Sequence, residues 1–395
     1  MVTQTPQKEL LRVNPKIYTK IRDLGASDVS ACFNCGTCTV SCPLSVNGAE
    51  FPRKYIRYAM LGVGEKILSR SEPWLCYYCG DCSDTCPSKA DPGAYMAAAR
   101  RYAIIEYSIG KIGNLFYSPI AAFFTYLVLT LFAVAGVWYF SQETTWNESE
   151  WDVYTFVSYD AIHIAGLIFG IVIFAIAFIQ ALIMLNYLRK GSEVPPDTPL
   201  FKKLVAMAKA AIRVGIGEGL AESRFLKCNS RARHIAHLAI FWGYVLTLIA
   251  TSVIAVTEML GESLLGWHRE DFEADIYPIV KPIAKVFGVI GGILLMIGAG
   301  FYVYKRLIKD DAYSQSSHFS DWIFLLLTFF IGLSGFIIDV IIYFFTDIMF
   351  WAYIMYGVHL VLVFLLIVTA AFTKFAHMEY RLLAVWFREY QRLVL

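Results

Sequence analysis

Two cysteine runs with the same spacing stand near the start of the chain and constrain its fold more than any other feature. Each run reads Cys-x-x-Cys-x-x-Cys-x-x-x-Cys-Pro. The eight cysteines are Cys32, Cys35, Cys38, Cys42, Cys76, Cys79, Cys82 and Cys86. Thiolates suit iron–sulfur clusters, and in such runs the fourth cysteine binds the cluster held by the other run. We therefore expect one 4Fe-4S cluster on Cys32, Cys35, Cys38 and Cys86, and a second on Cys76, Cys79, Cys82 and Cys42. Structural zinc is the alternative, but it does not require this repeated tetrad followed by proline.

The composition of the chain indicates a membrane protein. Of 395 residues, 57% are hydrophobic and only 17% are charged, which is too apolar for an ordinary soluble surface. The formal net charge of +2 gives no support to nucleic-acid binding. The ninth cysteine, Cys228, lies in a basic stretch and is interpreted as an ordinary free thiol. Reduced thiols, and a start without an apolar signal core, favour a cytoplasmic position for the cysteine-rich head.

Apolar stretches long enough to cross about 30 Å of hydrocarbon occur six times after the head. They are predicted at 115–140, 161–188, 235–257, 283–304, 322–345 and 352–375. The predicted fold is all-α, with an α-helical ferredoxin-type dicluster domain fused to a six-helix transmembrane bundle. The expected parts are 1–110 (the dicluster domain), 111–190 (two spans), 191–233 (a basic connection), 234–379 (four spans) and 380–395 (an amphipathic tail).

The distribution of charge predicts how the chain crosses the membrane. The connection 189–233 holds ten Lys or Arg residues, whereas the loop 141–160 holds none. Because cytoplasmic loops carry an excess of Lys and Arg, the connection is expected inside and both termini with it. The acidic loop 258–282 is expected outside. We therefore expect a multi-pass protein of a bacterial or archaeal cytoplasmic membrane. Within the connection, Leu204 to Phe225 resembles an amphipathic helix that lies on a membrane or meets a partner, or else a solvated helix face.

Histidines at the ends of the spans predict haem sites, because a polar ring in lipid needs a partner. Eighteen residues make five helical turns, so His359 and His377 are predicted on one face of the sixth span, roughly 27 Å apart. By depth, His163 matches His359 near the outer surface, and His237 matches His377 near the inner surface. His234, one turn from His237, is the alternative inner ligand. We expect two b haems with two histidine ligands each, against the alternative that the rings are structural.

Three further ionisable residues lie near the outer surface, namely Asp339 in the fifth span and Lys281 and Lys285 at the start of the fourth. They could relay protons from a quinol bound beside the outer haem. The alternative interpretation is that each side chain simply reaches interfacial water.

The head resembles the iron–sulfur C subunit of heterodisulfide reductases, through ACFNCGTCTVSCP (Ala31 to Pro43), FPRKYIRYAM and WLCYYCGDCSDTCP (Trp74 to Pro87). The membrane part resembles the cytochrome b subunits of those enzymes and the gamma subunit of respiratory nitrate reductase. Their fusion in one chain is similar to the C subunits of quinone-interacting membrane-bound oxidoreductase complexes of sulfur-metabolising microbes.

The gamma-subunit resemblance implies specific residues. Its two ligands eighteen residues apart fall on His359 and His377, with Lys374 at its basic position. Its HxxxFxG signature falls on His237, Phe241 and Gly243. Tyr244 occupies the position of a second ligand in that helix, and His163 is the expected replacement for the outer haem.

The expected function is electron transfer between menaquinone or another quinone, two b haems, two 4Fe-4S clusters and cytoplasmic flavin subunits. The resemblance implies heterodisulfide reductase A-like partners and, through the complex, adenylylsulfate reductase. The chain is expected to act as a subunit of an oxidoreductase without substrate chemistry of its own. Alternatives are a subunit of a membrane heterodisulfide reductase or of a formate- or hydrogen-linked complex, a transporter or proton pump with a redox-sensing head, and a tethered ferredoxin.

Overall fold

The fold is described from a computed structural model. It describes residues 12–45, 51–141, 156–227, 230–265 and 277–395. Cys228 and residues 1–11 lie outside the described part. In the acidic loop 258–282, residues 266–276 lie outside it, and the side chains of 258–265 and 277–278 are also not described. The described residues form helices and turns, with no strand among them, so the all-α prediction is confirmed.

Short helices form the cysteine-rich head. They are α1 (Lys16–Asp23), η1 (Ser27–Ala31), α2 (Thr37–Val40), α3 (Arg53–Met60), α4 (Gly64–Leu68), α5 (Glu72–Leu75), α6 (Asp81–Asp84) and α7 (Pro92–Tyr107). The longest of these, α7, is buried on almost every side and carries the head's core. It starts at Pro92, with the Asp91 carboxylate accepting from the backbone N–H of Ala94 at 3.0 Å. A proline in the first turn and an aspartate cap are both favourable helix starts.

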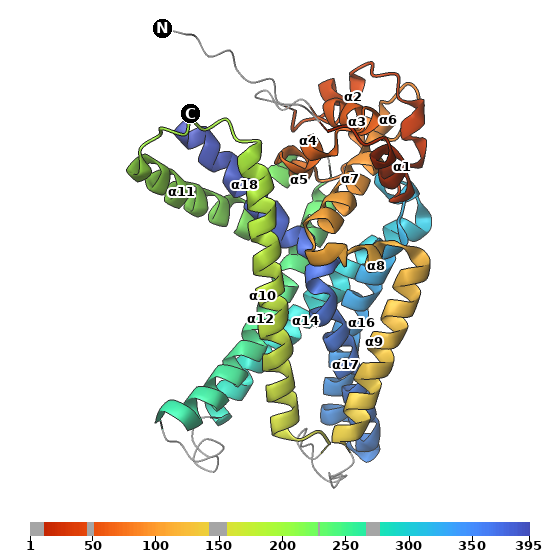
Figure 1. Ribbon diagram of the computed structural model, residues 1–395. Coiled ribbons are helices and arrows are strands. Elements are labelled where there is room, and N and C mark those ends of the chain that lie inside the picture. The colour runs from red at the N-terminus through yellow and green to blue at the C-terminus, as the bar shows by residue number, and fades with distance from the viewer. Residues whose placement is uncertain (1–11, 46–50, 142–155, 228–229, 266–276) are drawn as a thin grey trace.

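Long helices follow the head, and all of them except the last, which is amphipathic, are apolar. After the short η2 (Ile109–Lys111) and α8 (Asn114–Tyr117) come α9 (Pro119–Phe140), α10 (Tyr159–Lys190), α12 (Arg231–Leu265), α14 (Tyr277–Ile308), α16 (Phe319–Phe344), α17 (Met349–Thr369) and α18 (Ala376–Val394). Six segments of the described chain are long and apolar enough to cross a membrane, the last of them made by α17 with α18, as predicted. Figure 1 shows the head stacked on one end of this bundle, at the same end as α18.

Small residues let α12 and α14 pack closely. A Cβ added at Gly298 would lie 2.6 Å from the carbonyl oxygen of Ala236, and one at Gly243 would lie 2.8 Å from the Leu295 side chain. Membrane helices usually associate by close approach of their backbones at small residues. In lipid the hydrophobic effect does not favour helix association, so van der Waals packing has to supply the stability. The Gly243 of the sequence signature therefore has a packing role.

The last span corrects one prediction. His359 and His377 were expected on one face of a single helix, but α17 ends at Thr369 and the chain passes through η8 (Ala370–Phe372) before α18 begins. Thr373 has an extended backbone (φ −113°, ψ −166°), which interrupts the helix between the two histidines. The interruption lets Lys374 reach Asp321 in α16 at 2.8 Å and turns α18 away from the axis of α17 (Figure 1).

The basic connection contains α11 (Leu200–Val214), followed by the π-helical turn η4 (Gly215–Leu220) and η5 (Ser223–Lys227). The predicted amphipathic helix thus begins earlier than Leu204 and ends before Phe225. One face of α11, with Ala206, Ala210 and Val214, is buried. It packs against α18, so the predicted amphipathic tail is part of a helix pair at the head end of the bundle (Figure 1).

Candidate redox centres

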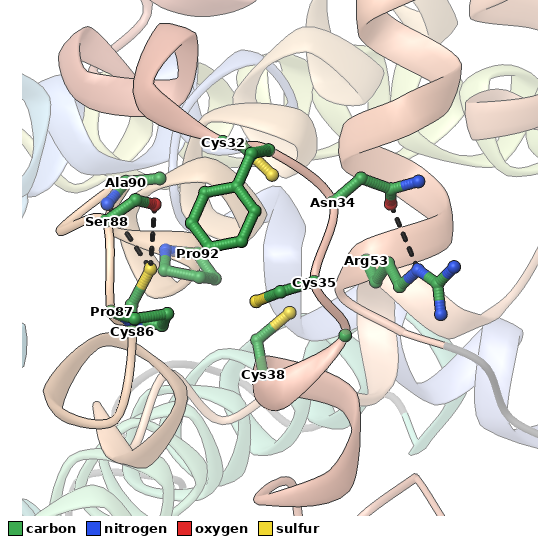
Figure 2. A pocket seen from close by; sticks show the side chains of 12 residues that line it. Cys32, Asn34, Cys35, Cys38, Arg53, Cys86, Pro87, Ser88, Ala90 and Pro92 are labelled. Atoms are coloured by element: carbon green, nitrogen blue, oxygen red, sulfur yellow. Dashed lines mark hydrogen bonds between the residues drawn. The ribbon is translucent and has the colours of Figure 1, made fainter.

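The first four cysteines expected to act together line one pocket. Cys32, Cys35, Cys38 and Cys86 line a small pocket together with Arg53 and Pro87 (Figure 2). Cys86 comes from the second run, so the fold brings the fourth cysteine to the other run's loop as the spacing predicts. The donor set is four thiols, which are the ligands that a 4Fe-4S cluster needs.

The other four cysteines also gather. Cys82, which is buried, interacts electrostatically with Cys76, Cys79 and Cys42 and least with Cys38, and Cys42 interacts with Cys76 and Cys79. The Thr85 hydroxyl donates to the Asp81 carbonyl oxygen at 2.8 Å and accepts from the Ser41 hydroxyl at 3.0 Å, which ties the two runs together. These four cysteines therefore lie in one region of the head.

Left-handed backbone positions shape both cysteine loops. Gly36 (φ +94°) and Gly80 (φ +100°) follow the second cysteine of each run, and Asn34 (φ 64°) and Tyr78 (φ 53°) precede it. At Gly36, an added Cβ would also lie 3.1 Å from the Arg53 guanidinium. Glycine reaches positive φ without the strain that a side chain brings. The repeated turn chemistry explains why both loops curl in the same way around their sulfurs.

Burial and hydrogen bonds give the thiols different acidities. Burial raises the pKa of Cys38 to about 11, and it raises the pKa values of Cys42 and Cys82. The Thr37 hydroxyl, 3.4 Å from the exposed Cys35 sulfur, lowers the pKa of that thiol. Backbone N–H groups also point at sulfur, from Tyr78 to Cys76 at 3.3 Å and from Ala90 to Cys86 at 3.4 Å. Hydrogen bonds to sulfur are one of the means by which proteins adjust the reduction potential of iron–sulfur clusters.

Arginines from the membrane helices hold the second cysteine loop. Arg233, at the start of α12, donates to the carbonyl oxygens of Tyr78 at 2.7 Å and Cys79 at 3.1 Å. Arg381, in α18, donates to the carbonyl of Trp74 and lies 3.6 Å from the Tyr77 ring centroid. The sequence shows these residues only as basic ones, and no spacing connects them with cysteines some 150 or 300 positions away. The second quartet is thus the one nearer the spans.

The two candidate histidines at the start of α12 have different partners. The Nδ1 of His237 lies 2.7 and 2.8 Å from the two carboxylate oxygens of Glu222, so it is the donor, and in the neutral ring its Nε2 keeps a lone pair. The Nε2 of His234 lies 3.0 Å from the Ala221 carbonyl oxygen, which can only accept. His234 therefore uses the nitrogen that His237 leaves available.

The remaining candidate histidines lie in or beside the last spans. The Ser334 hydroxyl donates to the Ile331 carbonyl at 3.1 Å and so accepts from Nδ1 of His359 at 2.8 Å, which leaves the His359 Nε2 with the lone pair. The His377 ring centroid lies 5.6 Å from that of Trp74, and the ring interacts electrostatically with His237. His163 is half-buried near the start of α10. The structure thus brings His237 and His377 into one region.

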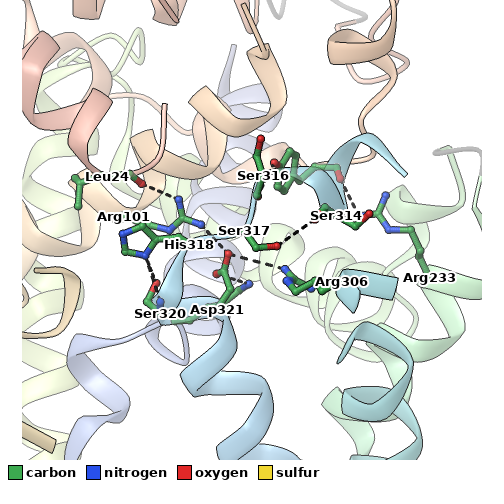
Figure 3. Close-up of polar contacts among 12 residues, drawn as sticks. Leu24, Arg101, Arg233, Arg306, Ser314, Ser316, Ser317, His318, Ser320 and Asp321 are labelled. Atoms are coloured by element: carbon green, nitrogen blue, oxygen red, sulfur yellow. Dashed lines mark hydrogen bonds and ion pairs between the residues drawn. The ribbon is translucent and has the colours of Figure 1, made fainter. Parts of the chain in front are cut away.

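A buried carboxylate joins the head to the spans. Asp321, in the first turn of α16, pairs with Arg101 of α7 at 2.7 Å, Lys374 at 2.8 Å and Arg306 of α14 at 3.9 Å (Figure 3). His318 caps the same helix beside them. Sequence reasoning missed Asp321, because an acidic residue in a first helical turn has many ordinary explanations.

Two of the three residues suggested for quinone chemistry meet at the other end of the bundle. Lys285 Nζ lies 3.6 Å from the Asp339 carboxylate and 3.3 Å from the Tyr343 ring centroid. Both members of the pair are about one-third exposed. Lys281, four residues earlier in α14, is exposed.

The fold and these sites define a class, a multi-pass helical membrane protein with an iron–sulfur head. Residues 28–90 match the 4Fe-4S dicluster domain family. Residues 118–392 match the family described as citrate utilization protein B, and the chain belongs to that family.

Curated relatives are similar to the head. A protein of Archaeoglobus profundus, described as like the C subunit of heterodisulfide reductase, is 33% identical over 107 residues, 27% of this chain and 57% of the relative. The C subunit of the H(2):CoB-CoM heterodisulfide,ferredoxin reductase of Methanothermobacter thermautotrophicus is 35% identical over 63 residues, 16% of this chain and 34% of the relative. The chain thus spans little more than half of the first relative and about a third of the second. No solved structure matches.

These comparisons confirm the resemblance of the head to heterodisulfide reductase C subunits and the presence of an iron–sulfur domain. They match the membrane part to a different family description from the cytochromes expected above.

Proposed function

We propose that this chain is a membrane electron-transfer subunit, in which two 4Fe-4S clusters and two b haems connect a menaquinone or quinone pool with cytoplasmic flavin subunits. The observation that carries the proposal is the contact between Trp74 and His377. Trp74 stands two residues before Cys76 of the second quartet, so the cluster loop touches a haem-ligand candidate. When bound, haems and clusters would supply one-electron transfer.

The cysteine quartets are proposed as cluster ligands in the predicted pairing. Cys32, Cys35, Cys38 and Cys86 would hold the outlying cluster, and Cys35 is the exposed member of that set. Cys76, Cys79, Cys82 and Cys42 would hold the cluster nearer the spans. This order makes the outlying cluster the place where soluble flavin subunits exchange electrons.

The inner haem is proposed on His237 and His377. Metal-binding histidines usually donate their second ring nitrogen to an oxygen acceptor, which fixes the ring and its tautomer. Glu222 accepts in this way from His237, whereas the Ala221 carbonyl occupies the Nε2 of His234. We therefore favour His237 over His234.

The outer haem is proposed on His359 and His163. The support is the Ser334 hydroxyl, which fixes the His359 tautomer with a free Nε2. Gly335 adds space, since a Cβ there would lie 3.4 Å from Cε1 of the His359 ring. Quinone chemistry is proposed beside this haem, with the Lys285–Asp339 pair and Lys281 as candidate proton carriers.

The orientation proposed from the charge pattern places the head and α18 in the cytoplasm. Flavin subunits like those of heterodisulfide reductase, and adenylylsulfate reductase beyond them, are the proposed partners. A subunit of a membrane heterodisulfide reductase is the second candidate, because the relatives of the head carry that name.

Reoxidation by a quinone tests the proposal. Chain reconstituted in lipid nanodiscs is reduced with dithionite, freed of excess reductant and mixed with a menaquinone analogue, while haem bands and cluster signals are followed. Wild type should be reoxidised at both kinds of centre. H237Q should lose the inner haem and slow cluster reoxidation more than tenfold, whereas H234Q, the matched control one turn away, should keep both. Equal rates in H237Q and wild type would contradict the proposed route.

A further inference from the structure

Glu222 is held in place by its neighbours as well as by its own bond to His237. Three consecutive residues, Leu220, Ala221 and Glu222, accept hydrogen bonds from side chains of α12: from Trp242 at 3.1 Å, from His234 at 3.0 Å and from His237 at 2.7 Å. The segment that ends the π-helical turn is therefore fastened along the helix that carries the candidate haem ligand.

The backbone at Glu222 has an uncommon conformation. Its φ is +45°, a left-handed value that is rare for a residue other than glycine, asparagine or aspartate. Such positions persist where surrounding contacts hold them, and they gather at functional sites. Glu222 is also only 7% exposed, so a carboxylate is buried here against the imidazole of His237.

We infer that Glu222 is a positioning residue that sets the redox potential of the inner haem by accepting a hydrogen bond from its ligand His237; this inference rests on the proposed haem site. A carboxylate acceptor makes an imidazole a more basic ligand than a neutral acceptor does. A more basic ligand favours the oxidised iron, and hydrogen bonding around the ligands is one of the ways in which a protein adjusts haem potential.

The outer candidate ligand offers an internal comparison. His359 donates to the neutral hydroxyl of Ser334, which gives its own proton to the Ile331 carbonyl. The two ligands thus have the same tautomer but acceptors of different charge. A change at Glu222 should alter the inner haem and leave the outer one as it is.

The experiment compares three variants of the full chain in detergent by haem content and redox titration of the visible bands. E222Q keeps an oxygen acceptor and should keep the inner haem with its midpoint shifted to higher potential. E222L removes the acceptor and should lower inner-haem affinity by about 10–100-fold. E218Q is the control: Glu218 is an equally buried carboxylate in the same segment, but it accepts from the Tyr77 hydroxyl at 2.7 Å instead of from a histidine.

The outcomes separate this inference from the proposed function. A shift in E222Q that clearly exceeds the shift in E218Q, at unchanged cluster content, supports it. Haem present in wild type, with E222Q and E218Q titrating alike and E222L fully loaded, overturns the inference alone. Wild type without haem overturns both. Cluster iron measured on each sample shows whether a variant has folded.

Discussion

At the scale of single residues, Asp321 shows how the head is fixed to the spans. Its side chain is 5% exposed and faces guanidinium groups from α7 and α14 and the ammonium group of Lys374. A buried carboxylate of this kind is tolerated because its partners compensate the loss of water. The same partners would be uncompensated without it, so Asp321 matters more than a surface charge would.

We predict that D321N lowers the free energy of unfolding by about 3–5 kcal/mol, because it leaves buried cations without their carboxylate. Chemical denaturation in detergent, followed by tryptophan fluorescence, measures this. D23N is the matched control, since Asp23 pairs with Arg22 on the surface at 3.1 Å. Its effect should stay below about 1 kcal/mol. Equal effects of the two variants would contradict the structural role given to Asp321.

His318 gives the fold a dependence on pH. Burial, and then the Arg101 guanidinium, lower the pKa of His318 from 6.5 to about 4, with Asp321 acting in the opposite direction and Lys374 in the same one. Between these two values the unfolded chain binds more protons than the folded chain. Stability contributed by the neutral ring is thus complete above pH 6.5 and is lost as the pH falls towards 4.

We predict that H318N flattens this dependence, since asparagine also caps a helix but does not titrate. Melting temperatures between pH 7 and pH 5 check it: wild type should lose stability more steeply than H318N as the pH falls. Parallel curves would show that His318 is not the group responsible.

At the scale of elements, the α12–α14 contact depends on the absence of side chains. We predict that G298A destabilises the protein by about 1–3 kcal/mol, because the new Cβ would meet the Ala236 carbonyl of the facing helix. G166A in α10 is the control, because nothing lies within 4 Å of the added atom. Thermal unfolding of the two variants in one detergent compares them. Equal melting temperatures would contradict the close packing.

The elements also show what the sequence could predict. Runs of apolar residues were sufficient to predict the six spans, because whether a segment can cross a membrane depends mainly on its own length and hydropathy. The interruption at Thr373 could not be predicted, since neither proline nor glycine marks it. The interruption coincides with a tertiary contact, between Lys374 and Asp321. Helix existence is thus local information, whereas helix direction depends on distant partners.

At the scale of the whole molecule, the proposed order of redox centres rests on which cysteine loop the long helices contact. Arg233 and Arg381 bind the second cysteine loop, and Trp74 lies against His377. Cysteine spacing was sufficient to predict both quartets, because three cysteines of each lie close together in one run and the repeated pattern points to the fourth in the other run. It could not show which quartet lies nearer the membrane, since that depends on contacts between residues far apart in the chain.

We predict that C42S and C86S have different consequences. Each should lose about four irons with its own cluster. C42S should also interrupt electron exchange between haem and the remaining cluster, whereas C86S should leave the haem in contact with the cluster nearer the spans. Freeze-quench EPR after haem reduction separates the two. Identical kinetics in both variants would contradict the assigned order.

The proposed route for electrons requires haem on histidines from separate membrane helices and clusters on the two cysteine quartets. The most direct measurement is haem and non-haem iron per polypeptide, together with the reduced-minus-oxidised visible spectrum of the purified chain. We predict two b-type haems and about eight cluster irons per polypeptide. Cluster iron alone, with no haem bands in the spectrum, would contradict it.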